Sequence, residues 1–327
     1  MQDDGWFCAR TGGSHRHFKH PTKPNPSRMQ VTRVGHSHVP PQLRRVNYDM
    51  APLSRPVFIA SRADFSGRLW HFAAMARQQA HRGAAPKDNQ LFGPRQLPAL
   101  RAAVHDLCWL LDRGYAAHSA TELVGNRHNL TSRQRQALSR CACPAAAAQL
   151  RRQRQLDPAG LRGRELWLDG YNVLTVLESA LAGGVVLLGR DGCCRDIAGI
   201  HRRYRKVNET LPALRLIGET TATWGVTCCR WWLDKPVSNS GRLKTLIHET
   251  ATAAGWNMTV ELVFSPDHVL WETDQIIATS DGVVLDRCRH WVNLARHIIA
   301  ERIPRARLVD LFLDGGGGPD GVVAEKP

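Results

Sequence analysis

Short apolar runs that alternate with helical periods, from Arg164 onward, constrain the fold of this chain more than any other feature. Three runs, "ELWLD", "VTCCRWWLD" and "DQIIATSD", end on an aspartate, and "GGVVLLGRD", "MTVELVFS" and "ARLVDLFL" are similarly apolar. Near-continuous apolar strands that are separated by helices indicate a parallel sheet that is covered on both faces. The sequence therefore predicts an α/β fold, a three-layer α/β/α sandwich with a mainly parallel sheet.

Four stretches between these runs are expected to be helical. They are "RDIAGIHRRYRKV", "ETLPALRLIGETTATWG", "SGRLKTLIHETATAAGW" and "RHWVNLARHIIAERI". In the third stretch, Leu243, Leu246 and Ile247 fall on one helical face, as a helix that covers a sheet requires. We place this α/β domain at residues 162–312.

A small all-α module is expected ahead of the α/β domain, at residues 95–155. Its first stretch, "LPALRAAVHDLCWLLDRGY", repeats apolar residues at helical spacing. Thr131 and Gln134 have the spacing of a capping box that opens a further helix. That helix is expected to present an arginine-rich outer face, with Arg133, Arg135 and Arg140.

The charge of the chain is unevenly distributed. Residues 95–165 contain 12 Lys and Arg against 5 Asp and Glu, a net charge of +7, whereas residues 166–327 contain 18 against 19. A basic module beside a near-neutral domain is typical of proteins that bind nucleic acid. An ordinary solvated surface gives the same pattern and is the alternative interpretation.

The two ends of the chain have the composition of tails. Residues 1–85 are basic and rich in proline and histidine, which predicts a disordered or mis-started tail, and residues 313–327 read as a flexible glycine-rich tail. The nine cysteines are odd in number, so we expect buried thiols in a reducing cytoplasm rather than disulfides. No apolar run reaches about 18 residues, and no membrane association is therefore expected.

Aspartates follow four of the apolar runs: Asp169, Asp191, Asp234 and Asp281. The carboxyl ends of parallel strands share one edge of a sheet, where α/β proteins bind their ligands. Carboxylates that gather there repel one another unless they are protonated or bridged by a cation, and oxygen ligands suit Mg²⁺ or Mn²⁺. We therefore predict that all four bind metal and that Asp169, Asp234 and Asp281 are catalytic. Ordinary helix capping by each aspartate is the alternative.

Two stretches are candidates for contact with a nucleic-acid backbone. "DKPVSNSGR" opens a helix after a strand, and it would offer a phosphate the polar groups of Ser238, Asn239, Ser240 and Arg242. "RDGCCRDIAGIHRRYRK" surrounds an aromatic residue with basic ones, so Arg195 is expected to bind phosphate and Tyr204 to stack on a base. Helix capping and a solvated helix face are the respective alternatives.

Two short motifs give the chain a resemblance to a nuclease family. The strand that runs into Asp169-Gly170-Tyr171-Asn172 and the later strand that ends in Thr279-Ser280-Asp281 resemble those of the PIN/NYN-like nucleases. The resemblance implies an α/β/α sandwich, RNA cleavage, and acidic residues around Mg²⁺ or Mn²⁺. It implies that Asp169 and Asp281 are metal-site residues with Asn172 in support. It also implies an acid on a middle helix, for which Glu178 and Glu249 are the candidates.

Residues from about 97 to 300 are also similar to prokaryotic families that are classified as domains of unknown function. "DLCWLLDRGY" and "ELVGNRHNLTSRQR" resemble family 434, and "RDGCCRDIAG", "DKPVSNSGRL" and "ATSDGVVLDR" resemble family 5616. These similarities imply the same two-part organisation, and they imply no activity.

The sequence thus predicts a cytoplasmic, metal-dependent ribonuclease that hydrolyses RNA phosphodiesters with Mg²⁺ or Mn²⁺, and its basic module helps to bind RNA. A homodimer is compatible with the sequence, and no protein partner is indicated. Two other functions stay open. One is a non-catalytic nucleic-acid-binding protein with a PIN-like fold, and the other is a phosphohydrolase that acts on nucleotides. The Asp-x-Asp motif of haloacid-dehalogenase phosphatases does not follow the first strand, which disfavours that form of the second alternative.

Overall fold

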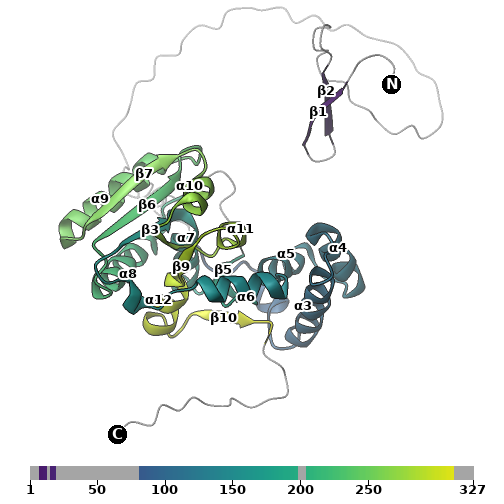
Figure 1. Ribbon diagram of the computed structural model, residues 1–327. Helices are drawn as coiled ribbons and strands as arrows, with labels where there is room; N and C mark the ends of the chain where they lie inside the picture. Colours follow the sequence, from purple (N-terminus) through teal and green to yellow (C-terminus); the bar gives the residue numbers. More distant parts are fainter. Residues whose placement is uncertain (1–6, 13–14, 20–80, 198–203, 313–327) are drawn as a thin grey trace, which may run out of the picture. The chain divides into compact units, whose positions relative to one another are not determined.

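The structure, a computed structural model, describes residues 7–12, 15–19, 81–197 and 204–312 (Figure 1). Residues Met1–Ala63 and Asp64–Pro327 form two separate units. In the first unit, β1 (Phe7–Gly12) and β2 (His15–Lys19) pair as an antiparallel hairpin. This hairpin lies inside the segment that we expected to be a disordered tail. The rest of that segment as far as residue 80, and the expected tail at 313–327, lie outside the described residues.

The second unit is built on a five-stranded parallel sheet, which confirms the predicted α/β fold. Its strand order is β7-β6-β3-β8-β9, and every neighbouring pair is parallel. The first strand of this sheet along the chain is therefore central, the next two lie on one side of it and the last two on the other. The winding reverses between β3 and β8, which makes the gap between their carboxyl ends the topological switch point. The strands are β3 (Glu165–Asp169), β6 (Cys228–Asp234), β7 (Met258–Val263), β8 (Ile276–Ala278) and β9 (His290–Val292).

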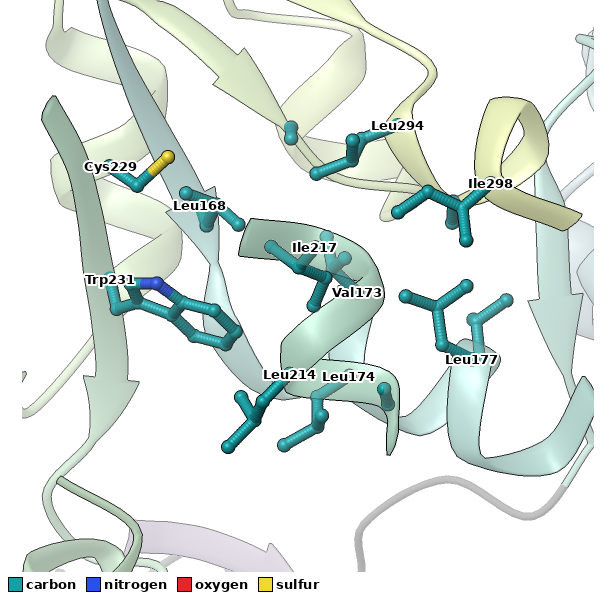
Figure 2. Packing of buried hydrophobic residues seen from close by; sticks show 14 of the residues in the cluster. Leu168, Val173, Leu174, Leu177, Leu214, Ile217, Cys229, Trp231, Leu294 and Ile298 are labelled. Carbon is teal, nitrogen blue, oxygen red and sulfur yellow. The ribbon is translucent and has the colours of Figure 1, made fainter. Parts of the chain in front are cut away.

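Helices cover both faces of this sheet. Because side chains alternate along a strand, Leu166 and Leu168 enter one apolar cluster, whereas Trp167 packs against the other. Figure 2 shows the first cluster, in which Leu168 and Trp231 of the strands gather with side chains of three helices. The helices of the first face are α7 (Gly170–Leu181), α8 (Thr210–Thr223), α9 (Ser240–Ala254) and α12 (Leu294–Arg302), and those of the second are α10 (Pro266–Glu272) and α11 (Gly282–Leu285).

A second, three-stranded sheet corrects part of the prediction. The runs "GGVVLLGRD" and "ARLVDLFL" form β4 (Val185–Leu188) and β10 (Arg307–Asp310), but they pair with each other and not with the main sheet. The expected helix at "RDIAGIHRRYRKV" is wrong at its start, because β5 (Cys194–Asp196) pairs antiparallel to β4. A tight turn at Gly192, with φ of 81°, reverses the chain between them. Residues 198–203 of that stretch lie outside the described residues.

The helical module confirms the prediction for its residues and packs on this second sheet. Thr131 and Gln134 form the predicted capping box at the start of α5. The apolar cluster of the module also contains Val185, Leu187 and Val309, which come from β4 and β10. The module therefore shares a core with the rest of the unit. Its helices are α2 (Asp88–Leu91), α3 (Leu97–Leu111), α4 (Ala117–Arg127), α5 (Ser132–Cys141) and α6 (Ala145–Arg154), and the 3₁₀ turn η1 (Pro158–Leu161) leads to β3.

The expected helix "RHWVNLARHIIAERI" begins instead as strand β9 and becomes helical only at Leu294. The eight cysteines from Cys108 to Cys288 are buried free thiols, as expected. In the described ranges, no helix combines the length and apolar content that crossing a membrane requires.

Candidate metal centre at the carboxyl edge of the sheet

Asp169 lies at the switch point of the main sheet, at the end of its central strand. Its side chain is buried, with 7% of the residue exposed. The register pairs Leu168 with Ala278, which brings the next residue of each strand together. Thr279 Oγ1 accordingly donates a hydrogen bond of 2.7 Å to Asp169 Oδ2. The two predicted motifs therefore meet, although they are 110 residues apart.

The residues after Asp169 are explained by the same close packing. A Cβ atom at Gly170 would lie 2.5 Å from Cδ2 of Leu233 and 3.1 Å from the carbonyl oxygen of Trp232. Only glycine therefore lets α7 start so close to β6. Asn172 Oδ1 accepts hydrogen bonds from the backbone N–H and the hydroxyl of Ser280, at 2.7 and 2.8 Å. Asn172 thus fixes the loop that carries Asp281.

Four carboxyl groups interact electrostatically at this edge. Burial is the main cause that raises the pKa of Asp169 to about 8; the hydrogen bond from Thr279 opposes this rise, and the nearby Asp281, Asp267 and Asp234 add to it. Burial also raises the pKa of Asp234 and of Asp267, and the latter is raised further by Asp281 and Asp234. Asp169 therefore lies within electrostatic range of Asp234 and Asp281, and the role of the three as metal ligands stays a prediction.

Asp267 is the member of this group that the sequence reasoning missed. It lies in the first turn of α10, directly after Pro266. The signal was present in "FSPD", because proline favours the first position of a helix and an acid favours its first turn. A short helix after β7 was not expected, and the carboxyl group was therefore not assigned to the edge of the sheet. Neither predicted middle-helix acid joins the group, because Glu178 is fully buried beside Tyr204 and Glu249 is exposed on α9.

The groups at this edge fit the chemistry of a hard divalent cation. All four are carboxylates, and a cation would relieve their mutual repulsion. The Tyr171 hydroxyl is buried without a hydrogen-bond partner among the described residues, and Asp234 is close enough to raise its pKa after burial has done so. Asp281 caps α11, since its Oδ1 accepts from the N–H of Val283 at 2.7 Å. In the described part of the chain, no three Asp, Glu, His or Cys side chains are close enough to one another to bind a single metal ion in their present positions.

Asp191 and Arg195 have a different environment from the one predicted. Asp191 lies in the turn between β4 and β5, where Arg195 and Arg151 contact its Oδ2 at 2.6 and 2.5 Å. Burial disfavours its charge, but the two guanidinium groups outweigh this effect and lower the pKa of Asp191 to about 2. Asp191 is therefore separate from Asp169, Asp234, Asp267 and Asp281, the four residues that we call the carboxyl group cluster. Arg195 is buried in this ion pair, which corrects its expected contact with phosphate.

Tyr204 is also placed differently from the prediction. The residue is 1% exposed, and its hydroxyl donates a hydrogen bond of 2.5 Å to Glu178 Oε1. Its ring packs against that of Tyr171, with the centroids 5.2 Å apart. A base cannot reach this ring, so the predicted stacking role is wrong. The basic residues around Tyr204 in the sequence indicated an exposed helix face, whereas the residue enters the main core.

The predicted phosphate seat lies at the start of α9, on the same edge as Asp234. Asn239 adopts a left-handed conformation with φ of 71° and donates a hydrogen bond to the carbonyl oxygen of Tyr204 at 2.9 Å. Ser240 is buried, and its hydroxyl donates to the carbonyl oxygen of Lys235 at 3.4 Å. Ser238 and Arg242 are exposed. Asn239 and Ser240 therefore shape the turn, and Ser238 and Arg242 present groups to solvent.

A polar cavity of about 280 Å³ is lined by residues of the helical module and of the loop at the edge of the sheet, and Asp281 is the one of the four carboxyl groups that lines it. Arg195 Nε donates to the carbonyl oxygen of Ser280 at 2.7 Å, and Arg151 donates to that of Gly282 at 3.1 Å. The helical module is thus tied to the loop that carries Asp281. The residues that line the cavity include Arg140, Arg151, Asn172, Arg195, Ser280 and Asp281.

Comparison with known proteins agrees with this two-part organisation. Residues 158–297 match DUF5616, a domain of unknown function. Residues 99–154 match DUF434, a protein family of unknown function. The predicted similarity to both families is confirmed. The DUF5616 match contains all four carboxyl groups of the edge, and the DUF434 match contains Arg140 and Arg151.

One curated relative matches more than half of the chain. It is the uncharacterized protein MJ0935 of Methanocaldococcus jannaschii, which is 28% identical over 188 residues. The match covers 57% of this chain and 89% of the relative. No solved structure matches the chain significantly. The resemblance to PIN/NYN-like nucleases stays a prediction.

Proposed function

We propose that this protein hydrolyses RNA phosphodiesters with the help of Mg²⁺ or Mn²⁺ at the carboxyl edge of its main sheet. The observation that carries the proposal is Asp169, a buried carboxyl group at the switch point whose pKa is raised to about 8 beside three other carboxyl groups. A fold maintains such a group at a cost in stability, and groups with strongly shifted pKa values concentrate at functional sites. A cation is the ligand that removes this cost.

Each residue of the edge has a role in this proposal. Asp169, Asp234 and Asp281 would hold the ion, and Asp267 is added to them because it interacts electrostatically with all three. The ion supplies Lewis-acid stabilisation of phosphate oxygens and a more acidic water. Thr279 orients Asp169, and Asn172 orients the loop of Asp281. Ser238 and Arg242, which are exposed at the start of α9, would contact a flanking phosphate.

The binding of RNA rests on exposed cations rather than on the predicted arginine face of α5. Arg133, Arg135 and Arg140 are engaged with Asp88, Glu122 and Asp196 respectively. Their charge is therefore largely used within the protein. Arg152, Lys235 and Arg242 are exposed and carry this part of the proposal.

The test is a calorimetric titration of Mn²⁺ into wild type, Asp169→Asn and the control Asp157→Asn, followed by RNA cleavage assays. Asp157 is exposed at the start of η1 and lies outside the carboxyl group cluster. We expect Asp169→Asn to lose both Mn²⁺ binding and cleavage, while Asp157→Asn keeps both and EDTA abolishes cleavage. Cleavage by Asp169→Asn at the wild-type rate would refute the proposal.

A second candidate function is non-catalytic nucleic-acid binding. It is favoured by the finding that no three potential ligands in the described ranges lie close enough together to hold an ion. RNA binding that EDTA does not change, without cleavage, would select this candidate. A panel of nucleotides and phosphomonoesters in the same assays tests for a phosphohydrolase.

A further inference from the structure

An exposed aromatic ring stands at the carboxyl edge of the main sheet, beside the carboxyl group cluster. Phe264 directly follows β7 and is 76% exposed, more than any other large apolar residue that the structure describes. Phe264 follows Val260 and Leu262 at intervals of two residues, which is the spacing of side chains on one face of a strand, and both of these residues pack into the main core. Phe264 lies beyond the last residue of the strand, where this core ends. The core therefore does not explain an aromatic residue at this position.

Lys235 holds a cation next to this ring. Its Nζ lies 5.1 Å from the ring centroid of Phe264. The N–H of Lys235 donates to the carbonyl oxygen of Val263 at 2.7 Å, so Lys235 is held beside the residue that precedes Phe264. Lys235 is exposed, and no described carboxylate forms an ion pair with it. Its charge is therefore available to a ligand.

The ring and the cation are next to two members of the carboxyl group cluster along the chain. Asp234 immediately precedes Lys235 and pairs in register with Val263. Asp267 follows Phe264 by three residues and interacts electrostatically with Asp234. If a divalent cation joined the phosphate of an RNA chain to these carboxyl groups, the nucleobase next to that phosphate would lie beside Phe264.

We propose that Phe264 and Lys235 form a subsite for an unpaired nucleobase and its phosphate, and hence that the RNA bound at this edge is single-stranded. This inference rests on the proposed function and names its substrate class. An aromatic face beside a cation is the combination that binds single strands without sequence preference. The bases of a duplex are stacked on one another and cannot cover Phe264. A protein partner that inserts an apolar side chain here is the competing occupant.

The test measures binding without cleavage, using the full chain with Asp169→Asn in EDTA. The ligands are a labelled single-stranded RNA of about 12 nucleotides and a duplex of the same length. We expect Phe264→Ala to weaken single-strand binding about fivefold or more, the lower limit for one stacked base, and to leave duplex binding unchanged. Phe264→Trp should keep the affinity. Lys235→Gln should lower the salt dependence of binding.

The matched control is Leu123→Ala, which removes a similarly exposed apolar side chain from α4. It should bind both RNAs like its parent. Equal loss for single strand and duplex, or no loss in Phe264→Ala, would overturn the subsite while Mn²⁺ binding and cleavage still support the proposed function. Absence of single-strand binding by the parent would overturn the subsite and would favour a protein occupant, whereas the proposed function is judged separately by Mn²⁺ binding and RNA cleavage of wild type.

Discussion

A carboxyl group that is buried beside other carboxyl groups makes the folded state sensitive to pH. The pKa of Asp169 is raised to about 8 in the folded protein, from the ordinary value of 3.8 for an aspartate. At pH values between about 4 and about 8, Asp169 keeps its proton in the folded protein, whereas the same residue in the unfolded chain has released it. The free energy of unfolding contributed by this group is therefore highest below about pH 4, falls as the pH rises to about 8, and is level above that.

Asp169→Asn should remove this dependence. Each pKa unit corresponds to about 1.4 kcal/mol, so we expect the variant to exceed wild type in free energy of unfolding by several kcal/mol, at most about 5 kcal/mol, at pH 8 without metal. Urea unfolding at pH 5 and pH 8 measures the difference. A difference that is the same at both pH values would show that Asp169 ionises normally. Mn²⁺ should raise the melting temperature of wild type only.

Gly170 tests the packing that holds Asp169 in place. A Cβ at this position would meet Leu233 at 2.5 Å, so Gly170→Ala should lower the free energy of unfolding by about 1–3 kcal/mol, as overpacking does. At Gly241 in α9 nothing lies within 4 Å of such an atom. Gly241→Ala should therefore be neutral or stabilising by up to about 1 kcal/mol. Equal urea midpoints for the two variants would contradict this packing argument.

Between elements, Asp191 joins α6 to the second sheet. Arg151 comes from α6 and Arg195 from β5, and both contact the same carboxylate. Because the two guanidinium groups bind the carboxylate oxygens of Asp191, these oxygens are not free to bind a metal ion. The turn that carries Asp191 therefore has a structural role and supports the site from outside.

Asp191→Asn should destabilise the protein without affecting the ion. Its loss leaves two guanidinium groups buried with less compensation, for which we expect about 3–5 kcal/mol in urea unfolding. Mn²⁺ affinity of the folded protein, measured well below the unfolding midpoint, should stay within twofold of wild type. A selective loss of Mn²⁺ affinity would instead return Asp191 to the set of metal ligands.

The parts of the fold that the sequence predicted are those in which local pattern and tertiary environment agree. The buried strands around Leu168, Trp231 and Ile277 had continuous apolar runs, and their parallel order brings Asp169, Asp234 and Asp281 to one edge. The pairing of β4 with β10 was not predictable from pattern, because an apolar run does not specify its partner strand. Tyr204 was misassigned for a related reason, since flanking arginines do not reveal whether a ring is buried.

For the whole second unit, the shared core has a thermodynamic consequence. Val185, Leu187 and Val309 of the small sheet pack with the helical module, so separating the module would expose them to water. We expect the helical module and the α/β domain to unfold in one cooperative transition. Thermal melts followed by circular dichroism and by tryptophan fluorescence should coincide. Two separated transitions would show that the modules fold independently.

The hydrogen bond between Asp169 and Thr279 spans 110 residues, and this separation determines when the site can form during synthesis. A ribosome releases the chain from its N-terminus, so Asp169 emerges long before the strand that holds Thr279 and Asp281. An incomplete chain thus has the first carboxyl group without its partners. The edge of the sheet therefore stays incomplete until almost the entire second unit has left the ribosome, and the proposed RNA cleavage would begin only then.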